Sequence, residues 1–272
     1  MKTRIIVAVI AIPVLVLVIF FAPLWVMGLV MGAISAGCAW EFLECTEREM
    51  PLAMRAFSAA CAFLLCFGVS VFPAELVYST VIFLLFAVLF CLLMLSFRKE
   101  EVMAFEAVAS CLTAGGIMPM LLSAVVRLGL HEHSSVYMLL PFVAAFSSDS
   151  GAYFAGTFLG RHKLTPHISP NKTIEGSIGG FLASMLLMAV YGLVLKAAKL
   201  EVNMSVMVVY GFLGSLACQL GDLSFSAVKR LYGIKDYGKL IPGHGGMLDR
   251  FDSMHWTAAI LAILAALVPA IG

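Results

Sequence analysis

The stretch LVYSTVIFLLFAVLFCLLMLS, residues 76–96, decides the class of fold, because it contains no charged residue. The hydrocarbon core of a bilayer needs about 20 consecutive apolar residues per helix, so this stretch predicts a membrane-spanning helix. The whole chain of 272 residues has the same character, with 62% hydrophobic and 12% charged residues. Soluble domains are only about half apolar. The sequence therefore predicts an all-α integral membrane protein.

Other apolar stretches on both sides of this one also predict transmembrane helices. The nine predicted spans cover approximately residues 5–21, 24–43, 57–72, 76–96, 104–126, 136–158, 174–195, 203–228 and 254–271. The first span follows Met1-Lys2-Thr3-Arg4 and resembles a secretory signal, but it has no clear small-x-small cleavage site, so we expect it to be retained. We expect one polytopic membrane domain, residues 1–272.

The distribution of basic residues predicts the orientation of these spans. With nine spans and a cytoplasmic N-terminus, only Arg127, Lys196 and Lys199 of the 17 Lys and Arg residues face the opposite side. Because basic residues concentrate in cytoplasmic loops, this bias favours a cytoplasmic N-terminus and a C-terminus on the opposite side. Two polar loops, about 159–173 and 229–253, then lie in the cytoplasm, where we expect them to form the active site. A net charge of +1 gives no reason to expect a nucleic-acid partner.

Two aspartates lie inside predicted spans. Asp222 follows Gly221 in the span 203–228, and an isolated carboxylate in hydrocarbon costs a few kcal/mol or more unless it gains a cation, a donor or a proton. Ser226 and Lys229 share its helical face. A helix-packing aspartate bonded to a neighbouring Ser or Thr is the alternative interpretation. Asp149 is the second such acid, and its sequence context leaves function and helix packing equally open.

The start of the last span combines carboxylates with glycines. Asp249 and Asp252 are three residues apart, which places them on one helical face. Helix capping with a salt bridge to Arg250 would explain them alone. However, Gly245 and Gly246 come just before, and glycines allow a backbone to approach an anion closely. Cationic side chains of the same segment are Lys229, Arg230, Lys235 and Lys239. Carboxylate oxygens beside such cations favour a magnesium site acting on a phosphate ester.

The other polar loop contains the run Ser169-Pro170-Asn171-Lys172-Thr173-Ile174-Glu175-Gly176. Ser or Thr next to Pro is ordinary chemistry for the start of a helix. The amide of Asn171 and the ammonium of Lys172 could also bind a base, a ribose or a phosphate on the same side of the membrane. We expect a binding function in addition to capping.

The segment from Ser226 to Asp252 resembles the signature of the bacterial phosphatidate cytidylyltransferases, or CDP-diacylglycerol synthases. That signature reads S-x-apolar-K-R-x4-K-D-x-small-x2-apolar-P/G-x-H-G-G-apolar-x-D-R-apolar-D, and every fixed position matches. The run 169–176 is similar to the S-P-x-K-T-x-E-G element of the same family. The signature covers about a tenth of the chain, and the expected length and span count agree with the family.

The resemblance implies a nucleotidyltransferase of phospholipid biosynthesis that converts CTP and phosphatidic acid into CDP-diacylglycerol and pyrophosphate. It also implies a bacterial inner membrane protein with its active site facing the cytoplasm, a lipid bilayer as surroundings, and a homodimer. The implied cofactors are Mg²⁺ and a second cation such as K⁺. Asp222, Asp249 and Asp252 are the expected metal residues. The expected catalytic residues are Asp222, Asp249, Lys229 and Arg230. The expected substrate-binding residues are Ser169, Asn171, Lys172, Thr173, Glu175, Ser226, Lys235, His244, Gly245, Gly246 and Arg250.

Two other functions are compatible with parts of this pattern. A related cytidylyltransferase for an ether or prenyl lipid would differ only in its lipid-facing walls. A secondary transporter would explain acids inside spans, but the polar residues gather near one membrane face rather than at the midplane. The CDP-alcohol phosphotransferases are disfavoured, because their D-G-x2-A-R-x8-G-x3-D-x3-D pattern is absent from the sequence.

Overall fold

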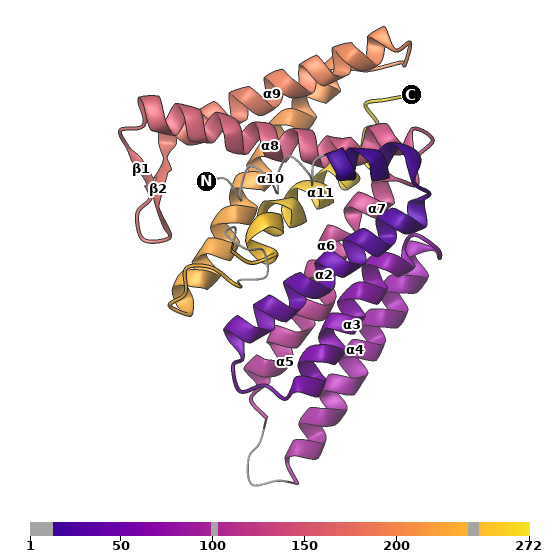
Figure 1. Cartoon of the computed structure of the whole chain (residues 1–272), viewed down its shortest axis with the longest axis vertical. Helices are drawn as coiled ribbons and strands as arrows, with labels where there is room; N and C mark the ends of the chain where they lie inside the picture. Colours follow the sequence, from indigo (N-terminus) through magenta and orange to yellow (C-terminus); the bar gives the residue numbers. More distant parts are fainter. Residues whose placement is uncertain (1–12, 99–102, 239–244) are drawn as a thin grey trace. The chain divides into compact units, whose positions relative to one another are not determined.

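The structure is a computed structural model that describes residues 13–98, 103–238 and 245–272. Apart from one short hairpin, its elements are helices (Figure 1). They are α2 (Leu24–Thr46), α3 (Leu52–Gly68), α4 (Ala74–Ser96), α5 (Phe105–Leu112), the π-helix η1 (Thr113–Ile117), α6 (Met118–Leu122), α7 (Ala124–Leu128), α8 (Ser134–Leu159), α9 (Ile174–Ala197), α10 (Met204–Leu231) and α11 (Leu248–Leu267). The chain forms two compact units.

The first unit contains residues 1–127 and 234–251. In it α2 packs along α3, and α3 also contacts the segment from α5 through η1 to α6. The π-helical turn contains Gly115, where an added Cβ would lie 2.9 Å from the carbonyl oxygen of Ser58 on α3. A glycine at this position therefore allows the two backbones to pack closely.

The second unit contains residues 128–233 and 252–272. Helices α8 and α9 pack side by side, and α10 contacts both. Two buried tyrosines attach the end of the chain to this bundle. The Tyr137 hydroxyl donates to the carbonyl oxygen of Ile271 at 2.7 Å, and the Tyr210 hydroxyl donates to that of Val268 at 2.8 Å. These bonds fix the segment that follows α11.

A β-hairpin occupies the polar loop that we expected between α8 and α9. Strands β1 (Lys163–Thr165) and β2 (Ser169–Thr173) are antiparallel, with Lys163 opposite Thr173 and Thr165 opposite Ser169. The all-α prediction missed this element. A two-stranded ribbon tolerates Pro170 because an edge strand does not need every N–H for pairing. The other polar loop is shorter than the predicted 229–253, since Lys229 and Arg230 still belong to α10 and Asp249 already belongs to α11.

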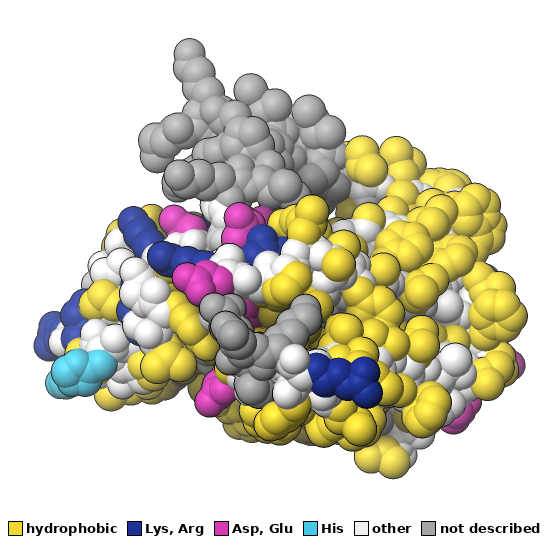
Figure 2. Space-filling model, turned by 90° about the horizontal axis from the view of Figure 1, so that it is seen from below, with side chains coloured by type: hydrophobic (Ala, Val, Ile, Leu, Met, Phe, Trp, Pro, Cys, Tyr) yellow, Lys and Arg dark blue, Asp and Glu magenta, His cyan; other side chains and the backbone are white. Residues whose placement is uncertain are grey.

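The predicted spans from residue 24 onward all coincide with helical segments, and in the first predicted span, 5–21, the described residues 13–21 are helical while residues 5–12 lie outside the described part of the chain. Within the described residues, five helical segments are long and apolar enough to cross a membrane: α2, α4, Phe105–Leu128, α9 and α10. Helix α3 is a shorter apolar helix. Large hydrophobic side chains such as Phe83 and Leu182 are exposed, and hydrophobic side chains cover much of the face in Figure 2. These features support a multi-pass membrane protein.

Candidate functional site

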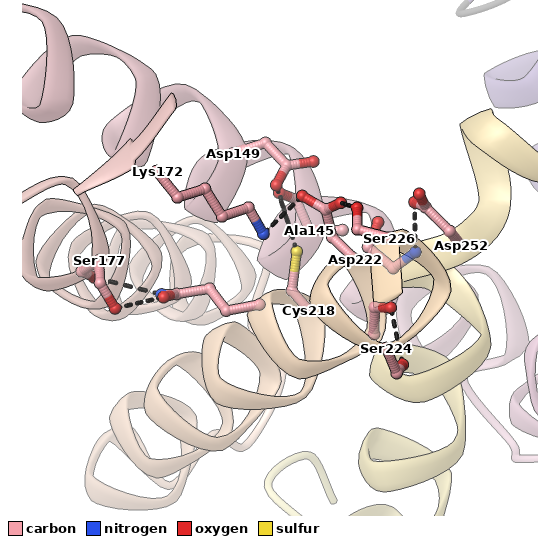
Figure 3. Close-up of polar contacts among 12 residues, drawn as sticks. Ala145, Asp149, Lys172, Ser177, Cys218, Asp222, Ser224, Ser226 and Asp252 are labelled. Atoms are coloured by element: carbon pink, nitrogen blue, oxygen red, sulfur yellow. Dashed lines mark hydrogen bonds and ion pairs between the residues drawn. The ribbon is translucent and has the colours of Figure 1, made fainter. Parts of the chain in front are cut away.

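An ion pair in the second unit joins the hairpin motif to Asp222, which lies four residues before the second motif begins. The ammonium of Lys172, on β2, lies 2.6 Å from Oδ2 of Asp222, which lies within α10. The Ser226 hydroxyl, one turn further along α10, donates to Oδ1 of the same carboxylate at 3.2 Å. Figure 3 shows the Lys172 side chain reaching across to Asp222. Asp222 therefore has both a cation, Lys172, and a hydrogen-bond donor, Ser226.

Asp149 extends this group of charges from a neighbouring helix, α8. Its Oδ1 accepts a hydrogen bond from Sγ of Cys218, on α10, at 3.4 Å. The carboxylate is close enough to interact electrostatically with both Asp222 and Lys172. Two carboxyl groups on different helices thus lie near one ammonium group.

Asp252 approaches the same charges from α11. Its side chain is 8% exposed, and its Oδ1 accepts the Ser253 backbone N–H at 2.7 Å. The charges of Asp222 and Lys229 both act on it. Gly221 permits this approach, since a Cβ there would lie 3.0 Å from the carbonyl oxygen of Asp252. We call this group of residues the α10 polar cluster: Asp149, Lys172, Asp222, Ser226, Lys229 and Asp252.

The α10 polar cluster has donor atoms that suit a hard cation. Its carboxylate and hydroxyl oxygens are ligands that Mg²⁺ and K⁺ accept, and an ammonium group already lies among them. Among the described residues, no group of three or more His, Cys, Asp or Glu side chains is arranged to hold a metal ion. Mg²⁺ in nucleotide enzymes typically uses only one or two carboxylates plus the substrate's phosphates. The donor chemistry therefore fits a cation that is shared with a phosphorylated substrate.

The residues around Lys172 build the hairpin. Thr173 caps α9, because its hydroxyl accepts the Gly176 N–H at 3.1 Å. Glu175 closes the hairpin by accepting the backbone N–H groups of Arg161 and His162 at 3.1 and 3.2 Å, and its other oxygen lies 2.6 Å from His162 Nδ1. Thr173 thus caps a helix and Glu175 closes the hairpin, whereas the Lys172 ammonium contacts the Asp222 carboxylate.

The remaining predicted residues of the second unit lie on the hairpin and at the end of α10. Ser169 belongs to β2, and Asn171 is exposed on the same strand. The Arg230 Nε donates to the carbonyl oxygen of Ile168 at 3.0 Å, which attaches the end of α10 to the hairpin turn. Arg230 and Lys172 therefore make separate attachments between the hairpin and α10.

Asp249 binds the backbone at both ends of the glycine segment, residues 237–246, in the first unit. Its Oδ2 accepts the backbone N–H groups of Tyr237 at 2.8 Å and Gly246 at 3.0 Å. Gly245 has φ +84°, a left-handed conformation that favours glycine. We expected the glycine amides to face a bound anion, but the Gly246 amide donates to a carboxylate of the protein itself. His244 and Lys239 lie outside the described residues, and Lys235 and Arg250 are exposed.

Sequence reasoning missed Glu41, a buried acid on α2. Its side chain is 4% exposed, and its two oxygens accept the backbone N–H groups of Met247 and Leu248, each at 2.9 Å. Glu41, like Asp222, lies inside a predicted span, where an isolated carboxylate needs a partner. It was missed because the motif containing its partners is about 200 residues away in the sequence.

Comparison with known proteins places these residues in a family. A family model described as "Cytidylyltransferase family" matches residues 2–268. The chain is 44% identical over 138 residues to the phosphatidate cytidylyltransferase of Bacillus subtilis (strain 168), covering 51% of this chain and 50% of that protein. It is 39% identical over 183 residues to the phosphatidate cytidylyltransferase of Staphylococcus haemolyticus (strain JCSC1435), covering 66% and 67%. The matches thus span from about half to two thirds of these relatives' lengths. The match of the family model along nearly the whole sequence shows that this chain belongs to the cytidylyltransferase family.

Proposed function

We propose that this protein transfers the cytidylyl group of CTP to phosphatidic acid and forms CDP-diacylglycerol and pyrophosphate. The observation that carries this proposal is the 2.6 Å contact between Lys172 and Asp222, which, with the hydrogen bond from Ser226 to Asp222, brings both sequence motifs into one polar cluster among apolar helices. The relatives named phosphatidate cytidylyltransferase support the same reaction. A membrane-embedded chain is suited to a substrate with two acyl chains.

The chemistry of the substrates explains why such a site needs charge rather than a strong base. A phosphate monoester has its second pKa near ~6, so the lipid phosphate is already an anionic nucleophile at neutral pH. One of its oxygens forms a bond to the α-phosphorus of CTP, and the bond from that phosphorus to the bridging β-phosphate oxygen breaks. Pyrophosphate leaves with that electron pair. The main obstacle is the repulsion between two anions, which positioned cations reduce.

The cationic side chains have distinct parts in this proposal. Lys172 and Lys229 belong to the α10 polar cluster, and Arg230 is attached to the hairpin through Ile168. We assign these three to the phosphates of the two substrates. On the basis of the family signature, we assign four further groups to the triphosphate of CTP: Lys235, Arg250, His244 and the glycines of the motif. Ser169, Asn171, Thr173 and Glu175 shape the hairpin that presents Lys172.

A divalent cation completes the proposed site, and we propose Mg²⁺ with a second cation such as K⁺. The carboxylates of Asp222, Asp249 and Asp252 are the residues that would hold the metal, as the signature implies. When bound, the metal would neutralise charge on the triphosphate. The residues of the chain themselves orient the phosphates, keep water from the lipid side, and hold Lys172 near the carboxylates.

The proposed setting follows from the charge distribution along the sequence. Nine spans with a cytoplasmic N-terminus would place the hairpin and the glycine motif on the cytoplasmic side. CTP would enter from the cytoplasm, and the lipid would enter sideways from the bacterial inner membrane. A homodimer is proposed only on the resemblance to the family.

The reaction can be tested by following two labels of CTP in detergent micelles that contain phosphatidic acid. The α-phosphate label should appear in a lipid-soluble product, whereas the γ-phosphate label should appear in pyrophosphate. Chelation of divalent ions should stop both, and excess Mg²⁺ should restore them. Transport needs a closed compartment, so turnover in detergent also separates an enzyme from a transporter. If neither label moves with purified, folded protein, the proposed function is wrong.

The same assay separates the proposed lipid from its alternatives. Ether-linked and prenyl phosphates are offered in turn at equal concentration, and the rates are compared with that for phosphatidic acid. We expect phosphatidic acid to give the highest kcat/KM. A higher kcat/KM with a prenyl phosphate would mean that the lipid substrate is a prenyl phosphate, and the proposed cytidylyl transfer would remain.

A further inference from the structure

Glu41 on α2 contacts the start of α11, and the proposed reaction assigns it no part. Each of its carboxylate oxygens accepts one backbone N–H from the start of α11, Met247 at Oε1 and Leu248 at Oε2, both at 2.9 Å. The first N–H groups of a helix have no partner within that helix. A negative charge is also favourable at this end of the helix. A buried side chain from a different helix therefore caps α11.

The backbone around Glu41 is shaped to allow this contact. A Cβ added to Gly238 would collide with the Glu41 side chain, which provides all three of its nearest atoms. A Cβ added to Gly246 would collide with Oε2 of the same carboxylate. Met247 packs against the same helix, with its sulfur 2.7 Å from the Cβ position of Gly37. Both described ends of the glycine segment thus lie against one carboxylate.

The segment held by Glu41 carries the residues assigned to the nucleotide. Gly246 precedes Met247, and Asp249 follows Leu248 directly. Asp249 in turn accepts the N–H groups of Tyr237 and Gly246. Two carboxylates, Glu41 and Asp249, therefore bind four backbone N–H groups of one segment. A shift of the Glu41 carboxylate would therefore also move Asp249.

We propose that Glu41 is a positioning residue: it fixes the first turn of α11 so that Asp249 and Arg250 face the phosphates of the nucleotide. This inference rests on the proposed function. Glu41 touches no reacting atom; it acts on the backbone that carries those residues. A role limited to stability would lower the amount of folded enzyme but would leave the KM for each substrate unchanged.

The direct test compares Glu41→Gln with Glu44→Gln. Glutamine has the size of glutamate but keeps a single carbonyl oxygen, so its NH₂ group would face one backbone N–H. Glu44 is an exposed residue on the same helix and provides the matched control. We expect Glu41→Gln to raise the KM for CTP by about 10- to 100-fold, as for residues that orient ligand groups, and to leave the KM for phosphatidic acid within twofold of wild type. We expect Glu44→Gln to behave as wild type.

Hydrogen exchange gives a measurement that does not depend on turnover. Loss of one hydrogen bond worth about 1.4 kcal/mol should speed amide exchange in a peptide covering residues 245–249 about tenfold. Unchanged exchange in Glu41→Gln, or a KM for CTP equal to that of the Glu44→Gln control, would overturn the inference. Absence of CDP-diacylglycerol formation by wild-type protein would instead overturn the proposed function, and the positioning role with it.

A second variant keeps the test decisive if Glu41→Gln does not fold. Gly238→Ala leaves the Glu41 charge in place but pushes a methyl group into its side chain. We expect the same selective rise in the KM for CTP. If Gly238→Ala is folded and its KM for CTP equals that of wild type, the geometry that we assign to Glu41 is wrong.

Discussion

The Lys172–Asp222 ion pair gives the sharpest prediction about the candidate site. The pair is 2.6 Å long, and the exposed fractions of its side chains are 26% and 33%. Fully exposed ion pairs contribute up to about 1 kcal/mol, and breaking a buried pair costs about 3–5 kcal/mol. A pair that is one quarter to one third exposed should lie between these limits. We therefore expect a coupling free energy of about 1–3 kcal/mol.

Activity measured in a double-mutant cycle detects this coupling. Lys172→Met and Asp222→Asn are assayed singly and together with labelled CTP and phosphatidic acid, and each kcat/KM is converted to a transition-state free energy. The double variant should be less impaired than the sum of the single effects by about 5- to 150-fold, because each change removes the partner of the other. Lys163→Met, an exposed lysine on β1, combined with Asp222→Asn is the control and should be additive. Additive effects of Lys172→Met and Asp222→Asn would refute the reasoning.

Three further changes test the scaffold around the site. Gly151→Ala would place a methyl group against Ala183 and within 2.7 Å of a carbonyl oxygen of α9, so thermal unfolding should show a loss of about 1–3 kcal/mol; an unchanged unfolding temperature would contradict the α8–α9 packing. Tyr137→Phe removes a buried hydrogen bond to Ile271 and should destabilise the protein by about 1–3 kcal/mol, with faster carboxypeptidase removal of the C-terminus as a second measurement. Glu175→Gln weakens the closure of the hairpin, so limited proteolysis should cut residues 163–173 faster than in wild type, and equal rates would argue against that closure.

Much of the fold could be predicted because hydrophobic length is a local property. Each predicted span from residue 24 onward coincides with a helical segment, since an apolar run long enough to cross a bilayer satisfies its backbone within itself as a helix. The hairpin could not be predicted in this way. Strands β1 and β2 are short and polar, and their pairing depends on Glu175, which binds backbone atoms of Arg161 and His162.

The candidate site was predictable where a motif carried its own chemistry. Asp222 and Ser226 share a helical face by spacing alone, and their hydrogen bond is present. The partner of Asp222 could be predicted only as a cation, a hydrogen-bond donor or a proton, because no local pattern pairs β2 with α10. Glu41 shows the same limit more strongly: it was missed although it lies in an apolar span, because its role depends on the distant N–H groups of Met247 and Leu248.

The central claim is that carboxylates among apolar helices hold cations that let two anionic substrates react. The most direct measurement is the rate of α-labelled CDP-diacylglycerol formation by Asp222→Asn at saturating substrates and Mg²⁺, with Glu44→Gln as a folded control. The account predicts a fall in kcat of about 10²–10³-fold, with each rate expressed per amount of folded protein. Turnover of Asp222→Asn within a few-fold of the control would contradict it.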